Sequence, residues 1–152
     1  MSMRGLIIFA LVVLTPTRVH ASDDAHIITS FESPQETEAL LSGAPGYDLR
    51  VRWVQEGAAH GRGAAEISFS TFEAAGGRNW PHTALNLGKT ESAITDWSDY
   101  RRLEVDVVNT TADTQDFGIA LRSERGGVGP AYRDLKPRGT ETIAFDLVTV
   151  GR

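Results

Sequence analysis

Residues 96–109, with the sequence DWSDYRRLEVDVVN, constrain the fold more than any other part of the chain. Leu103, Val105 and Val107 alternate with charged or polar neighbours, so an extended backbone would carry one apolar face and one polar face. A period of two residues is typical of a half-buried β-strand. The pattern therefore predicts a strand that covers a core on one side and is entered through a polar, aromatic turn.

Further segments repeat this alternation between turn-rich joints. The joints concentrate glycine and proline at residues 57–63, 76–77, 126–129 and 137–139. The predicted strands cover residues 26–31, 48–54, 65–69, 80–87, 116–121 and 141–147, with a short helix over 35–41. Short strands punctuated by Gly and Pro favour a sandwich or barrel over βαβ units. We therefore expect an all-β fold, a two-sheet antiparallel sandwich of the jelly-roll kind, in which no closing strand is visible after residue 147.

The first 21 residues have the features of a secretory leader. Arg4 supplies a positive charge, residues 6–14 are an unbroken apolar run, and Val19-His20-Ala21 resembles a cleavage site. The run is far shorter than the ~20 residues that span a bilayer. The sequence thus predicts a signal peptide over 1–21, one domain over 22–152, and a secreted or periplasmic mature protein.

Composition narrows the choice of partner. The leader carries two of the fifteen Lys and Arg residues and none of the twenty Asp and Glu residues, so the net charge of −5 becomes −7 after cleavage. An acidic protein is unsuited to nucleic acid, which is bound through its phosphates, whereas a neutral polysaccharide or oligosaccharide is compatible. With no cysteine, stability must come from the core or from a bound ion. No later stretch predicts a membrane span.

No catalytic constellation accompanies the strands. The chain has no cysteine nucleophile and no Gly-x-Ser-x-Gly motif, and none of its four histidines stands beside a plausible partner. Glu104 and Asp106 share a face, but on the outer side of a strand they are better explained as solvated surface than as a glycosidase pair. Residues 57–63 lack the Lys-Ser/Thr of a phosphate-binding loop and are interpreted as a turn. The expected protein is not an enzyme.

Asn109-Thr110-Thr111 permits two interpretations. The triplet matches an N-glycosylation sequon. Asn and Thr at the end of a strand are also ordinary turn residues. We favour the turn.

Aromatic rings offer flat, rigid surfaces on which sugars can stack. Trp53 lies on the same predicted strand face as Val51 and is expected in the core, and Trp97 and Tyr100 are expected to seat the strand that follows them. The candidate ligand-binding residues lie in the less regular segments: Trp80, Tyr132, Arg78 and Asn79.

Several short motifs together resemble a known family. They are Phe31-Glu32-Ser33, EGAAHG at 56–61, AEISF at 65–69, Trp80-Pro81, DWSDY with LEVDVVN at 96–109, and Phe145-Asp146-Leu147. Over residues 26–147 this pattern resembles the galactose-binding-like β-jelly-roll modules found with bacterial agarase- and β-galactosidase-type glycoside hydrolases. The resemblance implies a non-catalytic carbohydrate-binding module, as the N-terminal part of a polysaccharide-degrading enzyme. The alternative is a structural or protein-interaction sandwich without affinity for glycans.

The resemblance also implies a structural calcium ion near the first strand. The family's site uses an early Glu, carbonyls of a Gly-containing loop and a late Asp. In this sequence the corresponding residues are Glu32, Gly57, His60 and Asp146. Calcium takes carboxylate and carbonyl oxygens from separate loops, and the first and last strands of a sandwich can be neighbours.

Overall fold

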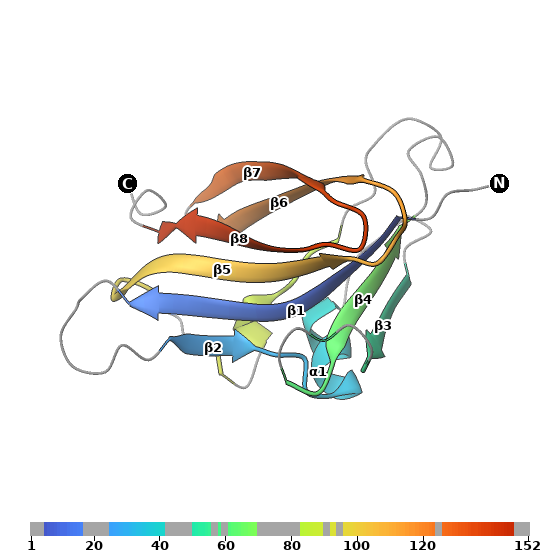
Figure 1. Cartoon of the computed structure of the whole chain (residues 1–152). Coiled ribbons are helices and arrows are strands. Elements are labelled where there is room, and N and C mark those ends of the chain that lie inside the picture. Colours follow the sequence, from blue (N-terminus) through green and yellow to red (C-terminus); the bar gives the residue numbers. More distant parts are fainter. Residues whose placement is uncertain are drawn as a thin grey trace.

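The computed structural model describes residues 5–16, 25–41, 50–55, 58, 61–69, 83–89, 92–93, 96–123 and 126–147. Antiparallel strands make up most of this part of the chain (Figure 1). They are β1 (Gly5–Pro16), β2 (His26–Thr29), β3 (Arg50–Val54), β4 (Ala64–Phe69), β5 (Tyr100–Asn109), β6 (Gln115–Ser123), β7 (Gly126–Leu135) and β8 (Thr140–Asp146), with the helix α1 (Pro34–Leu41) and the 3₁₀ helix η1 (Leu87–Lys89). The predicted all-β class is confirmed.

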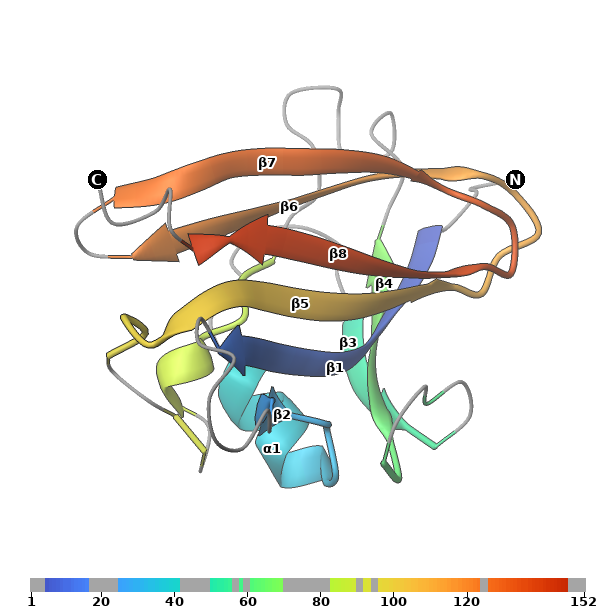
Figure 2. The ribbon, with the colours of Figure 1, turned by 60° about the vertical axis from the view of Figure 1, so that its left-hand side comes forward.

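The strands form two sheets that are small and not closed. The larger sheet has the order β3-β4-β1-β5-β8, with β2 paired to β1, and the smaller consists of β6 and β7. Figures 1 and 2 both show β6 and β7 beyond β8, and α1 at the opposite end of the molecule near β2 and β3. Among the described residues, no helix has the length and apolar character needed to cross a membrane.

The pairs β5–β8 and β6–β7 are nested in the sequence. β5 pairs with β8 from Arg102↔Asp146 to Val108↔Thr140, and β6 then pairs with β7, beginning at Gln115↔Leu135. The β5–β8 pair therefore continues into the β6–β7 pair as one two-stranded ribbon. This ribbon passes from the larger sheet into the smaller one, as expected of a double-sheet jelly roll.

The core follows the predicted alternation. Leu103, Val105 and Val107 are buried along β5, while the residues between them are only half-buried. Phe117 and Leu135, from the smaller sheet, join the same apolar cluster. The remaining buried members come from β2, β4, β8 and the segment after β2: Ile28, Phe31, Ala65, Ile67, Ile143 and Phe145.

Asn109 joins the end of β5 to the turn between β7 and β8. The residue is fully buried, and its Nδ2 donates to the carbonyls of Asp113 (2.8 Å), Leu135 (3.1 Å) and Lys136 (3.0 Å). Its Oδ1 accepts from the N–H and the hydroxyl of Thr111. Because Nδ2, the atom a glycan would modify, is used inside the fold, the interpretation of this triplet as a turn is confirmed.

Residues that the sequence analysis excluded as a leader form β1. This strand pairs with β4 through residues 5–9 and with β5 through residues 7–16, so it lies inside the larger sheet. An uncharged apolar run can serve either as the core of a leader or as a strand paired on both edges. In the structure the fold extends beyond the predicted domain of 22–152 to include Gly5–Pro16. Cleavage of the leader stays a prediction.

The helix α1 begins one residue earlier than predicted. The hydroxyl of Ser33 accepts the N–H of Glu36 at 3.1 Å, which is an N-cap, and Pro34 occupies the first helical position. The carboxylate of Glu36 in turn accepts the N–H of Glu32 at 2.8 Å and the hydroxyl of Thr29. These bonds fix the turn from β2 into α1.

The predicted strand over 80–87 is wrong in its described part. Residues 83–86 have no regular secondary structure, and η1 follows at once. Asn86 causes this change, because its Oδ1 accepts the N–H of Gly88 at 3.2 Å and its carbonyl accepts the N–H of Lys89 at 3.0 Å. Leu85 and Leu87 still pack against the core, so the apolar spacing marked buried residues but not a strand.

Candidate functional site

The predicted ligand-binding residues fall in two regions. Arg78, Asn79 and Trp80 lie outside the described residues. Tyr132 is described, and it lies on the strand β7 rather than in the loop that the glycine-rich sequence predicted. Tyr132 is 67 % exposed, and it and Ile27 are the exposed large hydrophobic residues of the described chain.

The ring of Tyr132 lies against the backbone of Gly118 on the neighbouring strand. The two residues are directly paired across β6 and β7. A Cβ atom placed on Gly118 would come within 2.9 Å of Tyr132 Cε1 and 3.0 Å of Cδ1. Glycine therefore allows the ring to lie close to the ribbon. The Cδ1–Cε1 side of the ring lies over Gly118, and much of Tyr132 remains exposed.

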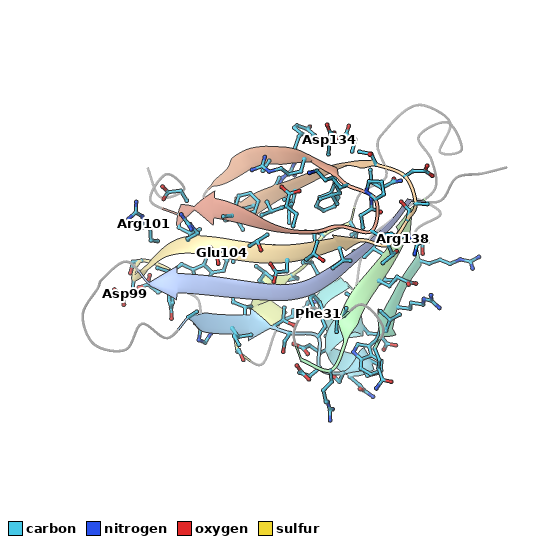
Figure 3. All side chains as sticks on the ribbon, viewed as in Figure 1. Phe31, Asp99, Arg101, Glu104, Asp134 and Arg138 are labelled. Carbon is cyan, nitrogen blue, oxygen red and sulfur yellow. The ribbon has the colours of Figure 1, made fainter. Side chains whose placement is uncertain are left out.

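Two carboxylates lie next to this ring. Asp116 and Asp134 are exposed and directly paired, two residues along the same two strands from Gly118 and Tyr132. Alternation puts all four residues on one face of the ribbon, and Asp134 is labelled on β7 in Figure 3. Directly opposed like charges weaken a sheet, and within the described part of the chain no ion pair of either carboxylate is found. We call these four residues the outer face of β6–β7.

The outer face could be read only in part from the sequence. The apolar side chains of Phe117 and Ile119 predict that Asp116 and Gly118 point outward. The partners on β7 depend on the register of the ribbon, because Phe117 lies opposite Arg133 and Ile119 lies opposite Ala131. The sequence analysis identified Tyr132 but missed its glycine support and the two carboxylates.

The aromatic turn before β5 is structural, as expected. The side chain of Asp96 accepts the N–H of Ser98 at 2.9 Å, and this bond lowers the pKa of the carboxyl. The N–H of Tyr100 bonds to the carbonyl of Trp97 at 3.0 Å, and both rings pack against the core. Tyr100 also meets the ring of His26 at a centroid distance of 6.1 Å.

Only some of the predicted calcium ligands can be placed. Glu32 lies beside the glycine loop, where its Oε2 accepts the N–H of Arg62 at 3.1 Å and forms an ion pair with the Arg62 guanidinium. Oε1 of Glu32 accepts the hydroxyl of Ser30 at 2.7 Å. Gly57 and His60 lie outside the described residues.

The structure does not bring Asp146 to Glu32. Val12 pairs with both Thr29 and Val105, and Val105 pairs with Ile143, so β2 and β8 are three strand spacings apart, or roughly 14 Å. Calcium takes six to eight oxygen ligands. Among the described residues no cluster of three or more carboxylate, histidine or cysteine side chains could hold a metal.

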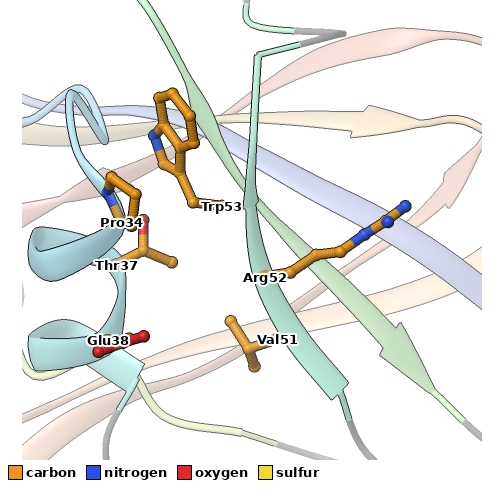
Figure 4. Close-up of a pocket in the computed structure, with 6 residues that line it drawn as sticks. All are labelled: Pro34, Thr37, Glu38, Val51, Arg52 and Trp53. Atoms are coloured by element: carbon orange, nitrogen blue, oxygen red, sulfur yellow. The ribbon is translucent and has the colours of Figure 1, made fainter.

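A separate pocket of about 390 Å³ lies between α1 and β3. Figure 4 shows Val51 and Trp53 on the face of β3 toward the helix, and Arg52 on the other. The pocket is lined by Pro34, Thr37, Glu38, Val51, Arg52 and Trp53. The Trp53 Nε1–H donates to the carbonyl of Phe31 at 2.7 Å, and its ring packs on the core. Trp53, which the sequence predicted in the core, is partly buried and packs against it, and its ring forms a wall of the pocket.

Comparisons with protein-family models, with characterised proteins and with solved structures found no match.

Proposed function

We propose that this protein is an exported, non-catalytic carbohydrate-binding module that holds its glycan on the outer face of β6–β7. The observation that carries the proposal is Tyr132, which is 67 % exposed and whose ring lies over Gly118. A flat ring that is already ordered can stack on the apolar face of a sugar with little loss of side-chain freedom. The galactose-binding-like resemblance points to the same ligand class.

The two carboxylates suit the polar edge of the same ligand. The carboxylates of Asp116 and Asp134 act only as hydrogen-bond acceptors. Sugar hydroxyls are donors, so a bound glycan would satisfy oxygens that now repel one another across the ribbon. A ring flanked by acceptors therefore favours a neutral glycan over an anionic one.

Affinity electrophoresis of the whole chain in gels containing agar, carrageenan, xylan or β-glucan tests the proposal. We expect one of the neutral glycans to retard the protein. Replacing Tyr132→Ala should weaken retention at least fivefold, the equivalent of roughly 1 kcal/mol for a central contact. Tyr132→Phe should retain most of the binding, and Ile27→Ala, which removes another exposed apolar side chain, is the matched control.

A second variant alters the position of the ring without changing its chemistry. Gly118→Val places side-chain atoms where the Tyr132 ring now lies, so the ring must move and retention should fall. Equal retention of Tyr132→Ala and the unmodified chain would refute the site. If none of the glycans causes retardation, the alternative of a structural or protein-interaction module is favoured.

A further inference from the structure

β1 occupies a slot between β4 and β5 in the larger sheet (Figure 1). Ile8 pairs with Glu66 on one edge and with Val108 on the other, and Ile7 likewise pairs with Ile67 and Asn109. The strand is antiparallel to both neighbours, and it is also the strand with which β2 pairs. The integrity of the sheet therefore depends on β1.

Removal of β1 would expose both walls of the slot. Ile67 on β4 and Val107 on β5 are fully buried, and Val105 is 3 % exposed. The backbone groups of β4 and β5 that face β1 would lose their partners, which is costly for a sheet interior. An open slot of this kind is a template for another strand.

The slot selects an uncharged strand. Glu66 on the β4 wall is buried, but its carboxylate is paired with Arg52 on the far side, on β3. The side chain of Asn109 on the β5 wall is satisfied by the turns around it. Since these polar groups already have partners, an incoming strand must supply backbone hydrogen bonds and needs no charged side chain. Residues 5–16, GLIIFALVVLTP, meet that requirement because none of them is charged.

The same residues have the features of a secretory leader, so export would remove the strand that closes the sheet. We propose that the slot between β4 and β5 is a strand-acceptor site. In the exported protein it takes an uncharged apolar β-strand from a second polypeptide, in the direction and register of β1. This is strand addition inside a sheet, in which main-chain hydrogen bonds supply affinity and side-chain pockets supply specificity. The inference rests on the export that the proposed function includes, but not on its glycan site.

The test begins with the whole folded chain. A specific protease site is inserted in residues 17–24, between β1 and β2, and cut after folding. The cut protein is mixed with an excess of labelled peptide carrying residues 5–16 and a lysine tail for solubility. Fluorescence anisotropy measures replacement of the cut strand by the labelled peptide. Amide hydrogen exchange measures the protection of β4 and β5. The uncut chain, whose slot is filled, is the control for non-specific binding.

We expect the peptide to replace the cut strand and to protect the amides of residues 65–67 and 103–109. A peptide with Ile8→Pro lacks one N–H at a position paired on both sides, so it should bind at least about tenfold more weakly. If the cut protein aggregates, it is diluted from denaturant with each peptide, and only the native peptide should restore soluble, protected protein. The proposal would be overturned if the two peptides bind equally well or if neither binds. It would also be overturned if the amides of β4 and β5 are fully protected when neither β1 nor a peptide is bound.

Discussion

Asn109→Ala is the substitution whose effect on the free energy of unfolding can best be worked out from the structure. The side chain is fully buried and contacts three carbonyls through Nδ2 and two groups of Thr111 through Oδ1. An amide NH₂ has two hydrogens, so the three carbonyls share two donors. Alanine therefore removes the equivalent of about four hydrogen bonds from a buried turn.

Each such bond contributes about 0.5–1.5 kcal/mol net, so we expect Asn109→Ala to lower the free energy of unfolding by about 4 kcal/mol. For a chain of this size that corresponds to a fall in Tm of roughly 8–16 °C. Asn109→Asp keeps the acceptor for Thr111 but turns a carboxylate oxygen toward the carbonyls. Since the fold disfavours that charge, it raises the pKa of the introduced carboxyl, so the penalty should be greatest at high pH, shrink as the pH falls toward the unfolded pKa of about 3.9, and be lowest below it.

Urea unfolding of the whole chain, followed by tryptophan fluorescence and circular dichroism, measures both effects. Thr142→Val is the matched control, because it removes one exposed hydrogen bond, from the Thr142 hydroxyl to Asp106. It should cost less than about 1 kcal/mol. A loss below about 1 kcal/mol for Asn109→Ala, or a pH-independent penalty for Asn109→Asp, would refute the reasoning.

Three further variants test other parts of the structure. Gly63→Ala would place its Cβ in collision with Trp53 Nε1, so we expect the free energy of unfolding in urea to fall by about 1–3 kcal/mol; an unchanged midpoint would contradict this packing. The N–H of Ser98 lowers the pKa of Asp96, so the stabilisation is present above the unfolded pKa of about 3.9 and lost as pH falls. In melting curves the Tm of the native chain should exceed that of Asp96→Asn, and this difference in Tm should shrink below about pH 4. A difference that does not change with pH would contradict the role of the Ser98 N–H. If calcium binds beside Glu32, calcium should raise Tm, a chelator should reverse the rise, and Glu32→Gln should abolish it; a Tm insensitive to calcium and chelator would exclude the site.

The strands β5 and β8 could be predicted because each packs one face on the core. Val105 and Ile143 are buried and paired, and the alternation around each of them is visible in the sequence alone. The outer face of β6–β7 was only half predictable, because the opposition of Asp116 and Asp134 depends on a register that no local pattern contains.

The role of residues 5–16 could not be predicted for a different reason. A strand inside a sheet can read as a continuous apolar run, and so does the centre of a leader. Composition therefore could not distinguish the two. The structure adds the register, in which Ile8 has partners on both sides.

The nested ribbon has a consequence for the order of folding. β5 to β8 pair among themselves within residues 100–147, apart from the edge of β5 that meets β1. β1, in contrast, must find residues 65–69 and 102–109, far along the chain. Loop closure makes such distant pairings slow. We expect the ribbon to form first as a cooperative unit and the larger sheet to assemble last. Since β1 is synthesised first, on the ribosome it would lack both of its neighbouring strands until β4 and β5 emerge.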